Sequence, residues 1–222
     1  MSTKSLQSRK RRRLAYSVLK RMLDLLVSGV AILLLLPIFP FIALAIRLDS
    51  PGPILFRQVR VGLDGKPFTM LKFRSMVADG DESIHRAYYE SLVVGEAQPR
   101  PNEHGDQVFL LDDPRVTRVG RFLRRTSLDE LPNLLNVFKG DMSLVGPRPP
   151  IPYEIELYDE RAKGRLVVKP GMTGLAQVSG RGSLTFARIT DYDLDYIRRR
   201  SMLLDLKILL RTIPAVLTRR GV

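Results

Sequence analysis

A long uncharged segment near the N-terminus constrains this chain most. Residues 25–46 form a 22-residue run without a charged side chain, and Asp24 is the last charge before it. As a helix, a run of this length can cross the hydrocarbon core of a bilayer, about 30 Å at 1.5 Å per residue. The absence of a polar face disfavours a buried core helix, and the length argues against a cleaved signal peptide. We therefore expect a membrane segment.

Two prolines interrupt this segment near its middle. Pro37 and Pro40 lack the N–H groups that would bond to carbonyls one turn earlier, so the helix should kink there. Each half is then about half a bilayer long. Basic residues crowd the segment 1–21 and resume at Arg47, and the positive-inside rule would keep both flanks in the cytoplasm. These features favour a re-entrant, monotopic helix over 22–48 rather than a single span.

The rest of the chain has the composition of a globular domain. The 222 residues are 45% hydrophobic, and the formal net charge of +13 calls for an anionic partner such as nucleic acid, anionic lipid head groups or a phosphorylated substrate. Without cysteine, a disulfide framework and a thiolate zinc site are excluded, and the histidines, His85 and His104, lack ligand spacing. We expect three parts: a basic segment (1–21), the membrane helix (22–48) and a cytoplasmic domain (49–222).

Short β-prone runs follow the membrane segment. Residues 54–61 and 68–73 flank Asp64-Gly65, a pattern typical of a β-hairpin. Its arms carry four cations, which form either an ordinary solvated strand face or an anion-binding wall: Arg57, Arg60, Lys72 and Arg74. Residues 77–114 are polar and acidic, and we interpret them as a variable loop with a short helix near 84–92.

Two adjacent carboxylates, Asp129 and Glu130, precede helix-spaced apolar residues in the centre of the chain. Thr126 or Ser127 can cap this helix, which Gly140 should end. Asp129 would then lie in the first turn, where unpaired N–H groups and the helix dipole favour an ionised carboxylate. Ser127 and Glu130 also fit an ordinary capping box. Because successive helical residues diverge by about 100°, the two carboxylates should have different roles.

Two later segments also carry recognisable patterns. Residues 165–181 mix β-prone residues with glycines, which let N–H groups approach a phosphate closely, but the spacing matches neither the dinucleotide nor the P-loop pattern. Residues 186–217 are helical by pattern, with Ser201 capping a second helix that is apolar enough for either the core or the membrane interface. The expected fold is α+β and mainly helical: a kinked re-entrant membrane helix, a small domain with a β-hairpin, and interfacial amphipathic helices.

Several motifs, taken together, resemble those of a known family. KRMLDL precedes the proline-broken run, and it is followed in order by QVRVGLDGKPF, KFRSM, RTSLDELPNLLNVFKGDMSLVGPRP and KPGMTGLAQVSGR. From about Lys20 onward the chain resembles the bacterial sugar transferases, also called monotopic phosphoglycosyl transferases or polyprenyl-phosphate sugar-phosphate transferases, which prime polysaccharide and glycan assembly. The N-terminal twenty residues and the 77–114 loop lie outside this resemblance.

The resemblance implies a phosphoglycosyl transferase at the cytoplasmic face of the inner membrane. Asp129, matched to the family's Asp-Glu dyad, would attack the sugar-bearing phosphorus of a UDP-sugar, release UMP and carry an aspartyl phosphosugar, which polyprenol (undecaprenyl) phosphate would then take up. Glu130 would assist with the metal or with protons, and both carboxylates would bind Mg²⁺. The sugar cannot be read from the residues, and the resemblance to exopolysaccharide-priming members implies a hexose such as glucose or galactose.

The resemblance also implies substrate contacts. Arg124 and Arg148 would bind phosphates, because a diphosphate attacked by an anion needs its charge neutralised. The glycine-rich stretch would help to hold the nucleotide through Pro170, Gly171, Thr173, Gly174, Gln177 and Gly180. The family usually has a Ser-Pro pair at the break of the membrane helix, whereas Leu36 precedes Pro37 here, which leaves Pro37 and Pro40 to set the kink.

Two alternatives to the covalent mechanism stay open at this stage. The carboxylates could hold Mg²⁺ for a direct transfer, or the chain could be a non-enzymatic, basic membrane adaptor. For the enzyme we expect a UDP-sugar, polyprenol phosphate and membrane lipids as partners and no nucleic acid, because no nucleic-acid module is recognisable and anchoring explains the basic N-terminus. A homodimer is one candidate for the oligomeric state.

Overall fold

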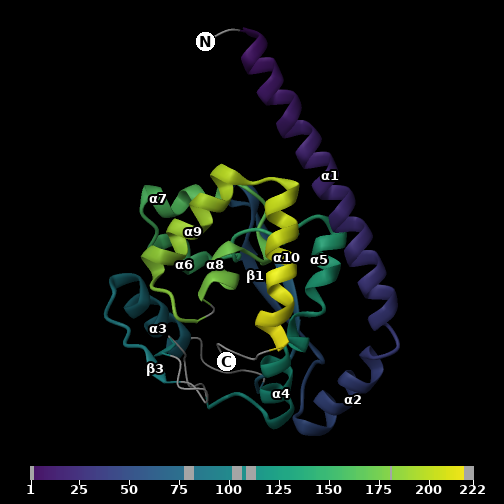
Figure 1. Cartoon of the computed structure of the whole chain (residues 1–222). Helices are drawn as coiled ribbons and strands as arrows, with labels where there is room; N and C mark the ends of the chain where they lie inside the picture. Colours follow the sequence, from purple (N-terminus) through teal and green to yellow (C-terminus); the bar gives the residue numbers. More distant parts are fainter. Residues whose placement is uncertain (1–2, 78–82, 102–106, 109–113, 181, 218–222) are drawn as a thin grey trace.

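A computed structural model describes residues 3–77, 83–101, 107–108, 114–180 and 182–217 (Figure 1). His104 and parts of the predicted 77–114 loop lie outside the described residues. The long helix α1 (Thr3–Leu35) runs along one side of a helical domain, and α2 (Phe39–Asp49) continues at an angle along its base (Figure 1).

The predicted kink lies between α1 and α2. Pro37 falls in the break, where the Ile38 N–H bonds to the Leu35 carbonyl, and Pro40 occupies the first turn of α2, which needs no N–H donor there. The helices meet at a bend of 65°. Within the described residues no single helix has the length and apolar character to cross a membrane, whereas α1 from Arg13 and α2 meet that test together as a bent pair.

Polar contacts from the KRMLDL segment attach α1 to the domain. Lys20 Nζ lies 2.9 Å from Asp205 Oδ2, and Arg21 donates to two carbonyls at the end of α5 (Asn133–Lys139), each at 2.7 Å. Asp24 is buried and accepts from the Leu144 N–H at 2.9 Å. Because α1 is continuous from Thr3, no break separates the predicted basic segment from the predicted membrane helix.

The predicted hairpin is confirmed. β1 (Leu55–Val61) pairs antiparallel with β2 (Pro67–Phe73), and Asp64 and Gly65 make the turn η1 (Leu63–Gly65) with positive φ angles of 54° and 77°. In this register Lys72 lies opposite Phe56, and Phe68 lies opposite Arg60. Because side chains alternate along a strand, Gln58, Arg60 and Lys72 share one face of the hairpin.

The other strands are short. β5 (Ser143–Val145) pairs in parallel with β6 (Gly171–Thr173), and β3 (Arg100–Pro101) pairs antiparallel with β4 (Gln107–Val108). The other helical elements are α3 (Ser83–Val94), α4 (Arg118–Thr126), η2 (Leu128–Glu130), α6 (Pro152–Glu156), α7 (Glu160–Lys163), η3 (Gly164–Val167), α8 (Leu175–Gly180), α9 (Phe186–Arg199) and α10 (Met202–Leu217). The described chain is thus α+β and mainly helical, as predicted.

The β-prone residues of the 165–181 segment lie mostly outside strands. Of residues 165–181, β6 takes three, and helices η3 and α8 take most of the remainder. Leu175 and Val178 of α8 pack against the main hydrophobic core, so tertiary packing outweighs the local strand preference. The helices predicted over 186–217 are confirmed as α9 and α10, and Ser201 Oγ accepts from the Leu204 N–H at 3.3 Å.

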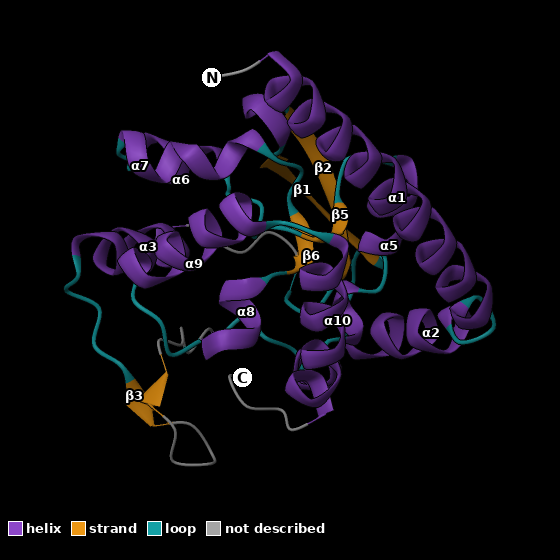
Figure 2. Ribbon diagram, turned by 45° about the horizontal axis from the view of Figure 1, so that its top comes forward, coloured by secondary structure: helices purple, strands orange, loops and turns teal. Residues whose placement is uncertain are grey.

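The main core lies where the strands meet the surrounding helices (Figure 2). Its buried members come from β2, α5, β5, α9 and α10 and the segment before β5: Met70, Leu134, Val137, Met142, Leu144, Val145, Tyr196 and Ile208. A second cluster joins α2 to β2 and α4 through Ile42, Ile46, Phe73 and Leu123. These contacts fix the bent helix pair rigidly against the hairpin that carries the candidate site.

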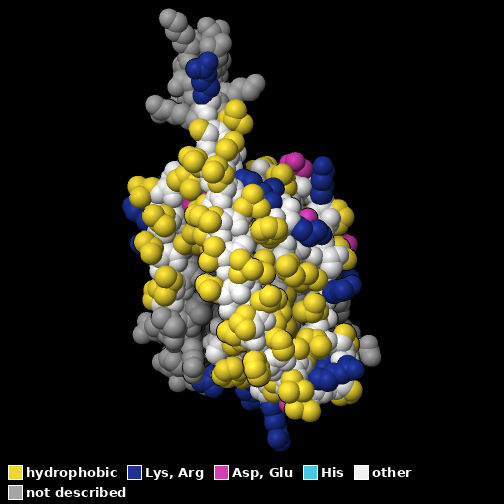
Figure 3. Space-filling model, turned by 90° about the vertical axis from the view of Figure 1, so that its right-hand side faces the viewer, with side chains coloured by type: hydrophobic (Ala, Val, Ile, Leu, Met, Phe, Trp, Pro, Cys, Tyr) yellow, Lys and Arg dark blue, Asp and Glu magenta, His cyan; other side chains and the backbone are white. Residues whose placement is uncertain are grey.

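Hydrophobic side chains remain exposed over the face of the molecule that carries α1 and α2 (Figure 3). Leu33 and Leu34 are each 70% exposed, Phe41 73% and Leu48 79%. Helix α10 likewise buries Ile208 and leaves Leu203, Leu206 and Leu210 exposed, so one face of it belongs to the core and another is apolar and exposed. A continuous apolar surface of this kind is unusual on a soluble monomer.

Candidate active site

Asp129 and Glu130 lie in a short turn between two helices. Helix α4 ends at Ser127, which has a left-handed conformation with φ of 57°, and the single turn η2 follows it. Thr126 Oγ1 donates to the carbonyl of Phe122, so it belongs to the last turn of α4. The predicted capping of a helix by Thr126 or Ser127 is therefore wrong. Both residues end α4, because Ser127 adopts a C-terminal cap conformation.

The end of the following helix is as predicted. Helix α5 begins after Pro132 and ends at Gly140, whose φ of 99° suits glycine and whose N–H bonds to the Asn136 carbonyl at 3.0 Å. Asn136 also connects α5 to β2, since its side chain accepts from the Leu71 N–H at 3.1 Å and donates to the Thr69 carbonyl at 2.7 Å. The turn with the carboxylates is thus held beside the hairpin.

The two carboxylates face different cavities. Asp129 lines a cavity of about 500 Å³ on the α3 side of the hairpin, here called the cationic cavity. Glu130 lines a second cavity of about 500 Å³ beside α8 and α10, here called the apolar cavity. Lys72 lines both, and its Nζ lies 2.7 Å from Glu130 Oε1. This divergence agrees with the different roles expected from neighbouring helical positions.

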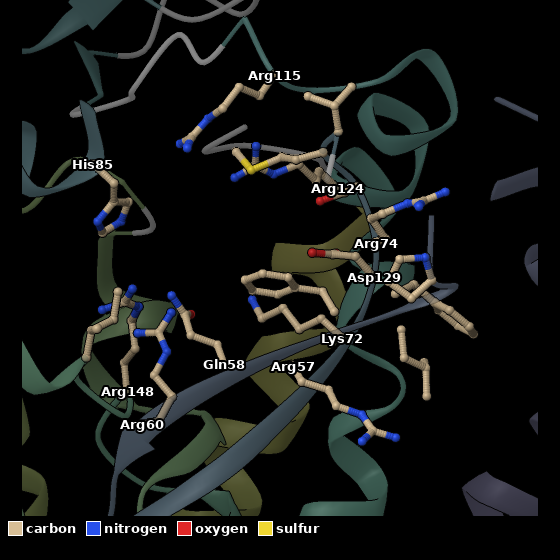
Figure 4. Close-up of a pocket in the computed structure, with 18 of the residues that line it drawn as sticks. Arg57, Gln58, Arg60, Lys72, Arg74, His85, Arg115, Arg124, Asp129 and Arg148 are labelled. Carbon is tan, nitrogen blue, oxygen red and sulfur yellow. The ribbon is translucent and has the colours of Figure 1, made fainter. Parts of the chain in front are cut away.

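Among the described residues, seven basic side chains line the cationic cavity together with apolar ones. Figure 4 labels them, and they come from the hairpin, from α4 and the segment just before it, and from the residues after β2 and β5: Arg57, Arg60, Lys72, Arg74, Arg115, Arg124 and Arg148. Asp129 itself is 7% exposed. One buried carboxylate among several cations is a suitable environment for a bound phosphate, whose charge the guanidinium groups can offset.

The pKa of Asp129 reflects these surroundings. Burial raises it to about 6, Lys72 and Arg124 lower it, and Glu130 raises it. The sequence predicted an ionised carboxylate stabilised by the start of a helix. The side chain is indeed mostly ionised at pH 7, but its pKa lies above the ordinary value because burial outweighs the stabilising charges.

The hairpin supplies one wall of the cationic cavity, and its cations are the ones whose role the sequence left undecided. Arg60 is 6% exposed, and its Nη1 donates to the Pro149 carbonyl at 3.0 Å. Burial, and then the charge of the neighbouring Arg148, lower the pKa of Arg60 to about 9. Lys72 and Gln58 line the same cavity. The alternation of side chains along β1 and β2 is the sequence signal that could have selected these residues.

Arg74 has a different task. Its guanidinium donates to the carbonyls of Pro51 at 2.6 Å and of Ser50 at 2.7 Å, directly after α2. A third bond, from Arg74 Nη2 to the Ile46 carbonyl at 3.3 Å, reaches the last turn of α2, where most carbonyls lack helical partners. Arg74 therefore fixes α2 relative to β2, and through β2 it fixes the membrane-helix candidate relative to the site.

Of the predicted phosphate contacts, both lie at the cationic cavity. Arg124 is in the last turn of α4, five residues before Asp129, and Arg148 follows β5. Arg148 Nη1 is 3.5 Å from Glu154 Oε2, and Glu154 is fully buried. The structure thus brings Arg124, Arg148 and Asp129 to one cavity.

The predicted nucleotide-binding residues are dispersed. Gly171, Thr173 and Gln177 line the apolar cavity, whereas Pro170, Gly174 and Gly180 line neither cavity. The glycines at 171 and 174 serve backbone packing: a Cβ at Gly171 would lie 2.1 Å from the Gly146 nitrogen, and one at Gly174 would lie 2.3 Å from the Gly146 oxygen. Glycine at these positions therefore has a structural reason apart from any ligand.

The acidic side chains allow one way of binding Mg²⁺. No group of three or more histidine, aspartate or glutamate side chains in the described ranges is arranged to hold a metal. Asp129 and Glu130 remain, and Mg²⁺ at nucleotide sites is commonly held by one or two carboxylates with substrate phosphates and water. Asp129 faces the cationic cavity and fits a cation that arrives with a diphosphate, whereas Glu130 faces the other cavity and is paired with Lys72.

Comparison with known sequences decides the family. The profile described as bacterial sugar transferase matches residues 15–219. The chain belongs to the bacterial sugar transferase family. The resemblance drawn from the motifs is thereby confirmed, and the family makes this protein an enzyme rather than a basic adaptor.

Relatives of this bacterial sugar transferase have informative names. It is 41% identical over 202 residues to the exopolysaccharide production protein ExoY of Sinorhizobium fredii, covering 91% of this chain and 87% of that protein. It is 44% identical over 216 residues to the UDP-glucose:undecaprenyl-phosphate glucose-1-phosphate transferase of Caulobacter vibrioides, covering 93% and 72%. It is 43% identical over 204 residues to the UDP-galactose-lipid carrier transferase of Erwinia amylovora, covering 91% and 41%. These names support a sugar-phosphate transferase.

Proposed function

We propose that this protein transfers a sugar 1-phosphate from a UDP-sugar to undecaprenyl phosphate, in the priming step of exopolysaccharide or glycan synthesis, with Asp129 as the nucleophile. The observation that carries the proposal is the buried Asp129 carboxylate facing a cavity lined by arginine and lysine. The names of the relatives support UDP-glucose or UDP-galactose as the donor.

The reaction has two displacements at one phosphorus. A carboxylate oxygen of Asp129 attacks the phosphorus that bears the sugar, the bond from this phosphorus to the bridging oxygen breaks, and UMP leaves with the electron pair. An oxygen of undecaprenyl phosphate then attacks the same phosphorus, the bond to Asp129 breaks, and the carboxylate is regenerated. The product is a lipid diphosphate sugar, and no redox partner is needed.

The cations around Asp129 have two effects on these steps. Lys72 and Arg124 oppose the rise of its pKa, which keeps the nucleophile ionised at neutral pH. Together with Arg60 and Arg148 they also offset the charge of the phosphates, without which an anion would not approach a diphosphate. Glu130 would hold Lys72 through their 2.7 Å ion pair and so orient the ammonium group.

Asp129 would hold Mg²⁺ when it enters with the donor, and this cation would neutralise further charge on the diphosphate. The second ligand predicted from the sequence, Glu130, faces the apolar cavity and is paired with Lys72 instead.

The lipid acceptor calls for a membrane location. The exposed apolar side chains of α1 and α2, the bend of 65°, and basic residues on both flanks support a re-entrant helix pair that enters from the cytoplasmic face and returns to it. The bonds of Arg74 to the carbonyls after α2 would then hold the cationic cavity near the surface of the bilayer, where undecaprenyl phosphate presents its head group.

The test is turnover of Asp129→Asn with UDP-glucose or UDP-galactose and undecaprenyl phosphate, read as released UMP. We expect a loss of at least about 10³-fold, because the amide is a poor nucleophile. Asp64→Asn is the matched control, since Asp64 is exposed in the hairpin turn and asparagine tolerates its positive φ. Turnover of Asp129→Asn at the control rate, in protein free of wild type, would refute the assignment.

A direct transfer without the aspartyl intermediate is the remaining alternative. In that case Asp129→Asn would also lose activity if the carboxylate only held Mg²⁺. A protein adduct formed from the UDP-sugar before any lipid is added distinguishes the two mechanisms, because direct transfer forms none.

A further inference from the structure

The end of the cationic cavity away from Asp129 has its own set of side chains. Figure 4 shows Asp129 and Arg124 on one side of the cavity and His85, Arg60 and Arg148 on the other. His85 comes from α3, outside the motifs from which the resemblance was drawn. The proposed reaction gives Arg60 and Arg148 a role at the phosphates but leaves His85 without one.

His85 is held in place by aromatic neighbours. Its Nδ1 shares a hydrogen bond with the hydroxyl of Tyr153, which also lines the cavity, and the two rings meet edge to face with centroids 6.3 Å apart. The ring of Tyr89 stacks on the other side, with centroids 6.5 Å apart. The far wall is therefore a fixed pair of rings that carry polar atoms.

The charge state of this wall suits a neutral ligand group. Burial, and then the positive charge of Arg148, lower the pKa of His85 to about 4, so the imidazole is neutral at physiological pH. A neutral imidazole, a tyrosine hydroxyl and the amide of Gln58 donate and accept hydrogen bonds without selecting for charge. These are the groups that recognise a nucleobase or ribose rather than a phosphate.

Two arginines, Arg60 and Arg148, lie beside this wall on the side of the cavity opposite Asp129 (Figure 4). Arg60 is 6% exposed, its Nε has no hydrogen-bond partner among the described residues, and its neighbour Arg148 adds like charge. A buried guanidinium with an unused donor and a cationic neighbour is strongly stabilised by an anion. A phosphate group between the two would supply one.

The stereochemistry of the proposed reaction determines the side of the cavity toward which UMP leaves. In phosphoryl transfer the attacking and leaving oxygens lie roughly in line on opposite sides of the phosphorus. If Asp129 attacks, UMP must leave toward the side of the cavity opposite Asp129. We infer that His85, Tyr153 and Gln58 bind the nucleoside of the donor, with the adjacent phosphate between Arg60 and Arg148. This inference rests on the proposed function and makes the far end of the cationic cavity, rather than the glycine-rich stretch, the nucleotide site.

Two substitutions and a control test the inference. Tyr153→Phe keeps the ring and removes the hydroxyl, and His85→Asn keeps a neutral polar group but shortens the reach. Glu90→Gln is the matched control, because Glu90 is on the same helix and pairs with Arg86 outside the cavity. We expect each test variant to weaken UMP binding by about tenfold in calorimetry and to raise the KM for the UDP-sugar equally. The KM for undecaprenyl phosphate, and kcat at saturating donor, should stay within about twofold.

The inference is overturned if UMP binding and the KM of the donor are unchanged in both variants. It is equally overturned if the KM for the donor and the KM for the acceptor both rise and the melting temperature falls. That result would show that the rings of His85 and Tyr153 have only a structural role. Binding of UMP requires no turnover. A wild-type protein that binds UMP through these residues but forms no lipid product would contradict the proposed function alone.

Discussion

Lys72 Nζ lies 2.7 Å from Glu130 Oε1, and the same lysine lines the cavity that Asp129 faces. The ammonium group of Lys72 thus acts on both neighbouring carboxylates. It forms an ion pair with Glu130, and its charge lowers the pKa of Asp129. The charge of Lys72 is the largest influence that opposes the burial of Asp129.

Replacing Lys72 by methionine should therefore affect both binding and ionisation. We expect kcat/KM to fall by about 10²-fold or more, because a group that stabilises developing charge is lost. We also expect the acidic limb of the pH profile to move to higher pH, because the pKa of Asp129 rises above about 6 once the cation is removed. A pH profile of kcat/KM measures both effects. Lys66→Met, in the exposed hairpin turn, is the control, and an unshifted acidic limb in Lys72→Met would contradict the coupling.

The raised pKa of Asp129 also predicts a cost in stability. For an acid whose pKa is higher in the folded state, the folded protein binds more protons between the two pKa values, so this group lowers stability as the pH rises from about 4 to 6. The shift corresponds to at most about 3 kcal/mol. The melting temperature of Asp129→Asn should consequently be higher than that of wild type at pH 7.5. At pH 4 the two melting temperatures should differ little.

Thermal unfolding in detergent with a chelator checks this prediction, because the chelator removes any cation that would bind the carboxylate. A melting temperature of Asp129→Asn below that of wild type at pH 7.5 would show that burial does not destabilise the ionised nucleophile.

Much of the architecture was predictable because local signals determine it. The prolines produce the bend, Asp64-Gly65 makes the hairpin, and Gly140 ends α5, each through its own backbone preference. Ser127 was misread because a serine before acidic residues resembles an N-terminal cap, whereas its left-handed conformation ends the preceding helix.

The site was predictable only where residues lie close in sequence or match the family motif. Asp129 and Arg124 are five residues apart, and Arg148 follows from the motif. His85 lies in a polar segment without ligand spacing, and only the packing of α3 against Tyr153 brings it to the cavity. Lys72 and Arg60 required the register of the hairpin, which selects one strand face from the two.

The close approach of β5 and β6 gives a prediction on folding. A methyl group at Gly171 would meet the Gly146 nitrogen at 2.1 Å, so Gly171→Ala should reduce stability by about 3 kcal/mol or more, or prevent folding. Gly29→Ala is the control, since its added carbon would lie 3.4 Å from the Phe138 ring and alanine is the better helix former. Chemical denaturation or expression yield provides the measurement. Equal stability of the two variants would show that the strands separate easily.

The bent helix pair predicts the topology of the chain. We expect tags at residues 1 and 222 to be labelled from the cytoplasmic side alone, because the bend returns the chain to the face it entered. Labelling of intact cells with an impermeant reagent, compared with labelling after permeabilisation, tests this. A tag at residue 1 that is labelled in intact cells would favour a span instead.

The central claim, that Asp129 carries the sugar phosphate, is tested most directly by intact-protein mass spectrometry after incubation with the UDP-sugar alone. The account predicts a mass increase of one sugar phosphate in the wild type and in Asp64→Asn, none in Asp129→Asn, and loss of the added mass when undecaprenyl phosphate is supplied. A wild-type enzyme that is active with both substrates but gains no mass from the donor alone, at times as short as one turnover, would contradict it.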